Sequence, residues 1–351
     1  MDISILFFGA GGPGPDGDHS AGYDDILAIA RAADELGFAA VWTPERHFQE
    51  VGQVFPSPAV LSAALAVATT RIAVRAGSVV LPLHHPLRVA EDWAVVDNLS
   101  RGRIGLSVAA GWHSADFVLA PGRYPDRREH ALQDLALLRR LWAGECVEFP
   151  DGTGRLVGVR SQPRPYSAHL PLWLTSSGNP ETWIAAGRLR TNVLAATAGQ
   201  SREEIAGKIR LYREAYQAAP EVPGTGPHGT VTLMAHTYVG ADDEDAVRRA
   251  SPPLRDYLKS YMRQTASNHG ERDGSGQLTP AEQDAVTQFA LHRYLAWGGL
   301  IGSPETCRKS LLDLKELGCD EVACFIDFGL GRDEVLAGLT RLAGLLEGSG
   351  E

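Results

Sequence analysis

The stretch from Phe38 to Phe48 reads FAAVWTPERHF, an apolar run that passes directly into charged and aromatic residues. Its first half is typical of a buried β-strand, so Glu45, Arg46 and His47 would follow the carboxyl end of that strand. A barrel of alternating strands and helices carries its active site at that end. A carboxylate, a guanidinium and an imidazole on one rim therefore form a candidate catalytic element, although a capped surface loop would use the same residues.

Strand-like and helix-like segments alternate along nearly the whole chain. Strands are predicted at residues 3–9, 39–43, 72–81, 103–110, 170–175, 192–196, 231–239 and 321–328, and helices at 24–36, 57–69, 86–99, 126–143, 180–188, 201–218, 304–317 and 333–346. This alternation predicts one α/β domain, a (β/α)8 TIM barrel over residues 1–351, with a doubly wound open sheet as the alternative.

Two segments interrupt the alternation. A Gly/Pro-rich piece at 145–165 is predicted to form a small hairpin excursion after the fourth helix. An insertion at 242–299 follows the seventh strand, and its middle, 268–277, is predicted to be mobile. We expect the insertion to act as a lid over the barrel mouth.

The composition excludes several classes of partner. The formal net charge is −10 and the basic residues are dispersed, so neither a nucleic acid nor a membrane surface is expected to bind. No apolar run approaches the ~20 residues that a membrane span needs, and the N-terminus lacks the pattern of a signal peptide, which predicts a cytoplasmic protein. The cysteines Cys146, Cys307, Cys319 and Cys324 are widely spaced, which favours buried reduced thiols over a disulfide framework or a metal site.

A dinucleotide-binding pattern near the N-terminus lacks its structural context. Residues 9–14 fit G-x-G-x-x-G and follow the first predicted strand. A dinucleotide fold needs a helix that opens directly on that loop, so that the helix N-terminus meets the pyrophosphate. Pro13, Pro15 and Gly17 break the chain instead, and the next helix is predicted only from Asp24. We therefore expect a flexible loop over the barrel mouth.

The segment from Ser176 to Pro180 passes from a predicted strand into a predicted helix. Asn179 is a suitable N-cap, and Pro180 suits the first helical position. The backbone N–H groups, the hydroxyls of Ser176 and Ser177, and the helix dipole would suit a phosphate near Gly178. A well-capped helix with nothing bound needs the same residues, so both interpretations stay open.

Other strand ends carry residues suited to a site. Trp112 and His113 follow the fourth strand and place an aromatic ring and an imidazole on the same rim as His47. Gly77 and Ser78 in the third strand leave room for a flat ligand, or else mark a bulge.

Further histidines and one aspartate lie near strand ends. The pair His84-His85 has no additional ligand at metal spacing, so no metal is expected. His236 and Asp327 fall near the ends of the seventh and eighth strands, where each can be either a site residue or a satisfied core polar group.

Nine segments carry a resemblance to a known family. They read VWTPERHF (41–48), RAGSVVLPLHHP (75–86), AEDW (90–93), VDNLS (96–100), GWH (111–113), DFVLAP (116–121), GNPET (178–182), GSPET (302–306) and CFIDFG (324–329). In this order they resemble the bacterial luciferase-like, flavin-dependent monooxygenases nearly end to end. The nearest resemblance is to the subgroup found with natural-product assembly lines, the nonribosomal peptide and polyketide synthases.

The resemblance implies a barrel that binds FMN, used as FMNH2 from a separate flavin reductase. Reduced flavin reacts there with O2 to form a peroxide that delivers one oxygen atom to the substrate. Carried over residue by residue, Ser176, Ser177, Gly178 and Thr182 match the turn that holds the flavin phosphate.

Further cofactor-side residues follow from the same resemblance. Gly77 and Ser78 match the position where the family often has a non-prolyl cis peptide beneath the flavin ring. Arg127 takes the place of an arginine that helps to hold the flavin. Ala110 stands where luciferase has a phosphate-side arginine, and Trp112 follows it on the cofactor side.

The catalytic residues depart from luciferase at one position. His47 matches the second histidine of the luciferase Glu-His-His-Phe run, whereas Arg46 replaces the first, which is the catalytic base there. Light emission and luciferase's own acid–base scheme are therefore not expected. We expect His47 to position the peroxide or accept a proton, with Glu45, Arg46 and His113 completing the catalytic set.

The expected function is monooxygenation of an acyl or aminoacyl intermediate tethered to a carrier protein, by hydroxylation at carbon or nitrogen, with epoxidation and Baeyer–Villiger insertion left open. Two alternatives stay open: a deazaflavin (F420)-dependent oxidoreductase and a non-catalytic flavin-binding or scaffold subunit. Members of the family usually form homodimers through helices near the second and third strands, so a homodimer is implied. Residues 195–198 differ from the subgroup's pattern, which predicts an altered pocket there.

Overall fold

The computed structural model describes residues 1–9, 20–48, 53–268 and 279–346, and within them it confirms the predicted TIM barrel. Parallel strands close into a ring in the order β11, β1, β2, β3, β4, β7, β8 and β9, because β9 pairs with both β8 and β11. Their bounds are β1 Asp2–Leu6, β2 Ala40–Thr43, β3 Ala73–Val80, β4 Ile104–Ala109, β7 Leu172–Ser176, β8 Asn192–Ala196, β9 Val231–Val239 and β11 Glu321–Phe325. The closed ring excludes the doubly wound open sheet.

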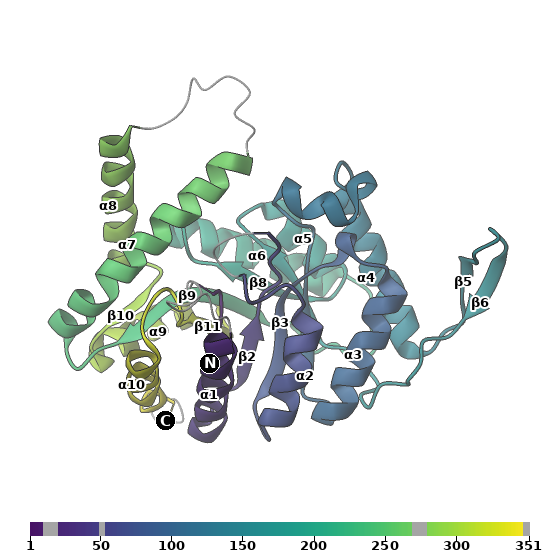
Figure 1. Ribbon diagram of the computed structural model, residues 1–351, viewed down its shortest axis with the longest axis horizontal. Helices are drawn as coiled ribbons and strands as arrows, with labels where there is room; N and C mark the ends of the chain where they lie inside the picture. The colour runs from purple at the N-terminus through teal and green to yellow at the C-terminus, as the bar shows by residue number, and fades with distance from the viewer. Residues whose placement is uncertain (10–19, 49–52, 269–278, 347–351) are drawn as a thin grey trace.

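Helices surround the barrel (Figure 1). Their bounds are α1 Ser20–Leu36, α2 Pro58–Ala68, α3 Pro86–Ser100, α4 Arg127–Ala143, α5 Pro180–Arg188, α6 Arg202–Ala218, α7 Asp243–Asn268, α8 Pro280–Ala296, α9 Pro304–Glu316 and α10 Arg332–Ala343. Several begin where the sequence supplies a cap: Asn179 accepts a hydrogen bond from Glu181 N, and Ser201 forms a capping box with Glu204. These caps fix where each strand-to-helix loop ends.

The core forms two layers because successive strand residues face opposite sides of the barrel wall. Ile5 and Val41 pack outward against the helices, and Leu6 and Trp42 belong to the cluster inside the ring. All described positions of β2 and β11 are buried, which explains why these strands read as continuous apolar runs.

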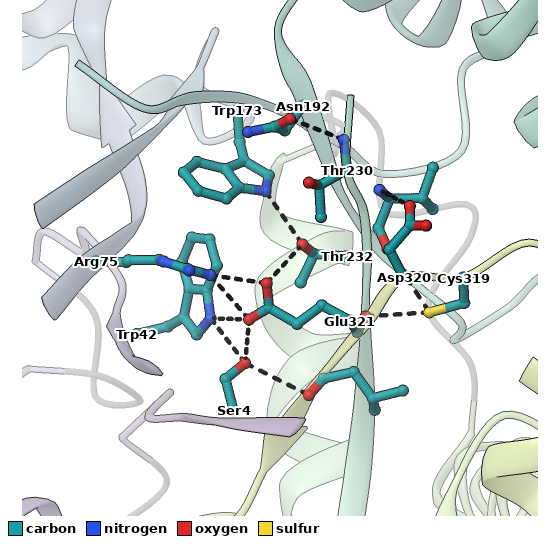
Figure 2. Close-up of polar contacts among 12 residues, drawn as sticks. Ser4, Trp42, Arg75, Trp173, Asn192, Thr230, Thr232, Cys319, Asp320 and Glu321 are labelled. Atoms are coloured by element: carbon teal, nitrogen blue, oxygen red, sulfur yellow. Dashed lines mark hydrogen bonds and ion pairs between the residues drawn. The ribbon is translucent and has the colours of Figure 1, made fainter. Parts of the chain in front are cut away.

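A paired charge lies inside the barrel, centred on Glu321 at the start of β11 (Figure 2). Ser4 Oγ and Trp42 Nε1 donate to its Oε1 at 2.6 and 3.3 Å, and Arg75 Nη1 reaches its two oxygens at 2.9 and 2.7 Å. The Arg75 guanidinium also lies 4.9 and 4.7 Å from the ring centroids of Trp42 and Trp173. The buried carboxylate is therefore both charge-paired and hydrogen-bonded.

The hairpin predicted within 145–165 is present: β5 Val147–Pro150 pairs antiparallel with β6 Leu156–Val159, and it projects from the barrel (Figure 1). The insertion folds as α7 and α8. A short strand, β10 Leu300–Gly302, then pairs parallel with β9. It was not predicted, because three residues are too few to show a period. Helix α1 begins at Ser20 and not at Asp24, and residues 10–14 and 269–277, expected to be a flexible loop and a mobile segment, lie outside the described residues.

The four cysteines are free, and three of them, Cys307, Cys319 and Cys324, are buried. Burial raises the pKa of each of these three thiols to about 12. Cys146 corrects the expectation of uniformly buried thiols: it is exposed, because it lies between α4 and the projecting hairpin. None of the described helices combines the length and apolar character needed to cross a bilayer.

Candidate functional site

Glu45 lies two residues beyond β2 and forms the centre of the site. Its Oε1 is 2.8 Å from His47 Nε2 and 2.6 Å from His84 Nε2, and Val80 N donates to its Oε2 at 2.6 Å. The Glu45 side chain has no exposed surface. Burial alone would raise its pKa, but the hydrogen bonds from His47, His84 and Val80 and the charge on His84 lower it to about 2. The carboxylate is therefore ionised and holds two imidazole rings.

His84 is the partner of Glu45 that comes from the next strand's loop. The sequence indicated no metal site at His84-His85 and gave His84 no other role. In the structure, Nε2 of His84 contacts the carboxylate of Glu45. Burial lowers the pKa of His84, but the hydrogen bond and the charge of Glu45 outweigh this effect and raise the pKa above its ordinary value. The pair thus favours a protonated ring.

A second acid–imidazole pair, His113 and Asp116, follows β4. Nδ1 of His113 is 3.8 Å from Oδ1 of Asp116, and this buried oxygen has no hydrogen-bond partner among the described residues. Burial raises the pKa of Asp116, and the nearby charge of Glu45 adds to the rise, while His113, His47 and Arg46 partly oppose it. Because these groups act on one carboxyl, the two acid–imidazole pairs lie close together. Asp116 was not singled out from the sequence, although it opens one of the segments that carry the family resemblance.

Arg46 extends the same rim toward β1 and β11. Its guanidinium carbon lies 3.7 Å from the ring centroid of Phe8. Phe8 N and Gly9 N donate to the two carboxylate oxygens of Asp327, each at 2.7 Å. Burial raises the pKa of Asp327 to about 6, although the two N–H groups and Arg46 oppose the rise. Asp327 therefore fixes the backbone of Phe8, whose ring contacts the guanidinium of Arg46.

The third strand contains the bulge that its small residues permit. The register of β3 against β4 shifts between Ala76 and Val79, and Ser78 Oγ donates to Gly77 O at 2.7 Å. A Cβ on Gly77 would lie 3.2 Å from Leu6 Cδ1, tighter than an ordinary contact. The expected cis peptide between Gly77 and Ser78 is wrong: within the described ranges, the peptide bond that is cis joins Gln162 to Pro163. The bulge bends the strand without a cis peptide bond.

The strand-to-helix turn after β7 combines a left-handed glycine with the Asn179 cap of α5. Gly178 has φ = 122°, and its N–H donates to the buried Ser176 Oγ at 3.3 Å. Ser177 is exposed and Thr182 is half-buried. Thr175 Oγ1 lies 2.6 Å from Ser107 Oγ on β4 and 3.4 Å from Gly77 O on β3. The turn is thereby continuous with the bulge.

A cation adjoins this turn from α6. A Cβ on Gly178 would lie 3.5 Å from Gln200 Oε1 and 3.8 Å from Lys208 Nζ. Lys208 donates to that same Gln200 oxygen. Lys208 was not predicted from the sequence, because only the packing of α5 against α6 brings it to the turn.

The other predicted cofactor-side residues lie beyond β4. Arg127 donates to Gly111 O at 3.1 Å and to Tyr124 O at 3.0 Å, so its guanidinium fixes the loop after Ala110. Trp112 is 41% exposed, and its ring meets that of His113 edge to face. Gly111 has φ = 81° in this loop. The structure thus joins residues 45–47, 77–80, 110–116 and 175–178 along neighbouring strands β2, β3, β4 and β7.

Residues 1–321 match the family described as luciferase-like monooxygenase. The chain belongs to the luciferase-like monooxygenase family. It is 25% identical over 330 residues to the oxygenase component of the flavin-dependent trigonelline monooxygenase of Acinetobacter baylyi, covering 91% of this chain and 88% of that protein. It is also 33% identical over 164 residues to 4-hydroxyprotoasukamycin monooxygenase of Streptomyces nodosus, covering 46% and 44% of the two chains.

Solved structures support the same fold for this luciferase-like chain. Monooxygenase RslO1 from Streptomyces bottropensis superposes with a TM-score of 0.78 at 24% identity over 99% of each chain. The oxygenating constituent of 3,6-diketocamphane monooxygenase from Pseudomonas putida, in complex with FMN, gives 0.75 at 17% identity over 99% and 98% of the chains. An F420-dependent secondary alcohol dehydrogenase gives 0.73 at 16% identity over 99% of each chain. The family and its named relatives identify the chain as a luciferase-like, flavin-dependent monooxygenase.

Proposed function

We propose that the protein is an FMNH2-dependent monooxygenase that hydroxylates a carrier-bound natural-product intermediate with one atom of O2. The observation that carries the proposal is the chain of contacts that links Glu45 through the β3 bulge to the strand that ends at Ser176. The Streptomyces nodosus relative, named as a 4-hydroxyprotoasukamycin monooxygenase, supports the natural-product part of this proposal, and attachment to a carrier is part of the proposal itself.

The residues of this surface fit a flavin mononucleotide. The turn offers the exposed Ser177, and the half-buried Thr182 on the first turn of α5, as donors for a phosphate, while the N–H of Gly178 is held by Ser176 Oγ. Lys208 supplies a positive charge at the turn. It can replace the phosphate-side arginine of luciferase, whose position is taken by Ala110 in this chain.

The flat ring of the flavin would lie against the β3 bulge. Gly77 and Ser78 present no bulky side chain there, and Ala110, Trp112 and the Arg127-fixed loop bound the same region. When bound, reduced flavin supplies the two electrons with which O2 is activated.

The acid–base work falls to the imidazoles. His47 Nε2 faces the carboxylate of Glu45, so Nδ1 is the ring nitrogen left to exchange a proton with a bound substrate. Glu45 is a positioning residue in this scheme, since both of its oxygens already accept hydrogen bonds. Asp116, whose pKa is raised by burial, and His113, 3.8 Å from it, are the second pair that can exchange a proton here. The positive charge of Arg46 acts on the carboxyl of Asp116 and opposes the rise of its pKa.

The experiment is an anaerobic titration with FMNH2, followed by admission of O2. Carrier proteins loaded with candidate acyl and aminoacyl groups are then analysed by intact-protein mass spectrometry for the gain of one oxygen atom. The expected result is tight FMNH2 binding and a mass increase that His47→Ala abolishes. His130→Ala, on α4, is the matched control. Full turnover by His47→Ala would contradict the proposed role of His47 in proton transfer.

The same titration separates the alternatives. Tight binding of deazaflavin F420 with weak binding of FMN would favour the hydride-transferring alternative, whose fold-level support is the likeness to the alcohol dehydrogenase. Binding of flavin with no O2 consumption on any carrier-bound substrate would favour a scaffold subunit. The relative described as an oxygenase component supports the proposal that a separate reductase supplies the FMNH2.

We also propose that the chain forms a homodimer through α2 and α3, which pack against each other. Val60 and Val67 on α2 are 72% and 68% exposed, and Val95 and Leu99 on α3 are 45% and 47% exposed. Exposed apolar side chains gathered on two adjacent helices are typical of a subunit interface.

A further inference from the structure

A buried histidine on β9 is enclosed by four aromatic rings. His236 is 5% exposed, and its ring centroid lies 4.4 Å from Phe325, 4.8 Å from Tyr294, 5.2 Å from Tyr257 and 5.6 Å from Phe328. Phe325 ends β11 and Phe328 follows it, whereas Tyr257 lies on α7 and Tyr294 on α8. We call these five residues the aromatic box. Two barrel strands and both helices of the insertion therefore meet at one imidazole.

The imidazole carries a polar atom without a partner. His236 Nε2 is buried and makes no hydrogen bond within the described part of the chain. Burial lowers the pKa of His236 to about 3, so the ring is neutral at physiological pH. A buried polar atom without a hydrogen bond destabilises the folded state and calls for an explanation. A ligand group that bonds to Nε2 supplies one.

The aromatic box is contiguous with the candidate active site. The ring of Phe8 lies 4.9 Å from Phe325 and 6.1 Å from Tyr257, and the same ring carries the guanidinium of Arg46 at 3.7 Å. One aromatic ring thus separates the box from the rim that holds His47. A ligand held in the box extends from this side toward the reacting centre.

We propose that the aromatic box is a substrate subsite that takes a flat, uncharged aromatic ring bearing a hydroxyl group, with the hydroxyl hydrogen-bonded to Nε2 of His236. The assignment rests on the proposed monooxygenase function and names the part of the substrate that this chain selects. Aromatic walls stack with an aromatic ring through offset and edge contacts. None of the five members carries a charge, which selects against ions. A hydroxyl group both donates and accepts, so it pairs with either tautomer of the ring.

Tyr294 gives the ligand its way in. It is the half-buried member of the box, whereas Tyr257, Phe325, Phe328 and His236 are buried. Its ring lies edge-on to the imidazole, so a change of its side-chain rotamer uncovers His236.

The test uses the full chain labelled with 15N-histidine and three probes: phenol, toluene and cyclohexanol. Phenol has both the ring and the hydroxyl, and each of the others lacks one of them. We expect phenol to shift the Nε2 resonance of His236 in a saturable way, with toluene and cyclohexanol at least about tenfold weaker. No shift of that resonance up to the solubility limit of phenol overturns the proposal, and this measurement needs no variant.

His236→Phe keeps a ring and removes the unpaired atom. We expect its affinity for phenol to fall by at least about tenfold. Its Tm should be unchanged or higher, and its affinity for FMN should be unchanged. His292→Phe, an exposed position on α8, is the matched control and should bind phenol normally. Equal phenol affinity in His236→Phe and the unmodified protein contradicts the subsite. Failure of the FMNH2 titration with normal phenol binding instead contradicts the proposed function and leaves the subsite standing.

Discussion

Glu45 shows how one carboxylate can organise side chains from two strands. It follows β2, yet two of its three partners, Val80 and His84, come from the end of β3 and the loop beyond. An ionised carboxylate buried with three donors is stable only while all of them remain. The position of His47, and with it the proposed proton transfer, therefore depends on residues outside its own segment.

Replacement of Glu45 by Gln should release both imidazoles. The amide keeps the size of the side chain but removes the charge, and its NH2 group faces a ring nitrogen that already carries a proton. We expect the free energy of unfolding to fall by about 3 kcal/mol and the pKa of His84 to return toward its ordinary value of 6.5. Chemical denaturation and an NMR titration of His84 measure the two effects. Glu129→Gln, an exposed position on α4, should change neither.

The same pair predicts a pH window for stability. The folded-state pKa of Glu45 is depressed, so its contribution is present above 4.5 and is lost as the pH falls through about 2. The folded-state pKa of His84 is raised, so its contribution is present below 6.5 and is lost as the pH rises through the raised value. Both contributions are complete between pH 4.5 and 6.5. The difference in Tm between the unmodified chain and Glu45→Gln should be greatest there, and a difference independent of pH would contradict this assignment.

Lys208 gives a prediction about cofactor selection. If its ammonium group faces the phosphate at Gly178, Lys208→Gln should weaken FMN binding about tenfold and leave riboflavin, which lacks the phosphate, unaffected. Fluorescence quenching of the two oxidised flavins measures both affinities. Lys309→Gln, exposed on α9, serves as the control. Equal losses for FMN and riboflavin would place Lys208 away from the phosphate.

Sequence reasoning located the rim residues but not their partners. Glu45, His47 and Ser176 could be found because each follows a segment with a clear strand pattern. Asp116 and Lys208 could not be assigned, because neither periodicity nor spacing reports contacts between side chains of different elements. The contact of His84 with Glu45 was missed for the same reason, because the two residues lie far apart in the sequence.

At the scale of elements, the strand pattern predicted the barrel because its strands are buried on both faces. The bounds of β8 and β9 were predicted to the residue, since turn residues delimit them. The strand β10 escaped prediction because of its length, and the bulge at Gly77 and Ser78 was only one of two interpretations of small residues. The sequence therefore did not predict β10 or decide the bulge, because both depend on packing between elements.

The charge inside the barrel should matter for stability and not for the cofactor. Glu321 and Arg75 lie in the first halves of β11 and β3, whereas the candidate site lies at and beyond the strand ends. Glu321→Leu leaves Arg75 unpaired, and we expect it to lower the free energy of unfolding by about 3 to 5 kcal/mol. FMN affinity of the folded fraction should stay unchanged.

A double variant sharpens this prediction. Arg75→Met together with Glu321→Leu removes both charges, so it should be more stable than Glu321→Leu alone. Denaturant titration of four proteins, the unmodified chain, the two single variants and the double variant, gives the coupling free energy between the two residues. A double variant that is less stable than both single variants would show that the pair contributes through packing.

At the scale of the whole molecule, the apolar face on α2 and α3 predicts the oligomeric state. Val60→Asp combined with Val67→Asp places two charges on that face, and a charge buried without a partner opposes association. We expect the variant to run as a monomer in light scattering, while the unmodified chain runs as a dimer. Leu312→Asp, an equally drastic change at an exposed residue of α9, should remain dimeric.

The insertion has a consequence for how this enzyme can diversify. The residues proposed to hold the cofactor lie between Glu45 and Lys208, whereas Tyr257 and Tyr294 of the aromatic box lie on α7 and α8. On our proposals, the flavin site and the two tyrosines of the box are encoded in separate stretches of one gene, while His236, Phe325 and Phe328 stay with the barrel. Exchanging the segment between β9 and β10 with that of a relative would give a chimaera with a new preference and the same flavin site, so this fold can acquire specificities by recombination without rebuilding its catalytic apparatus.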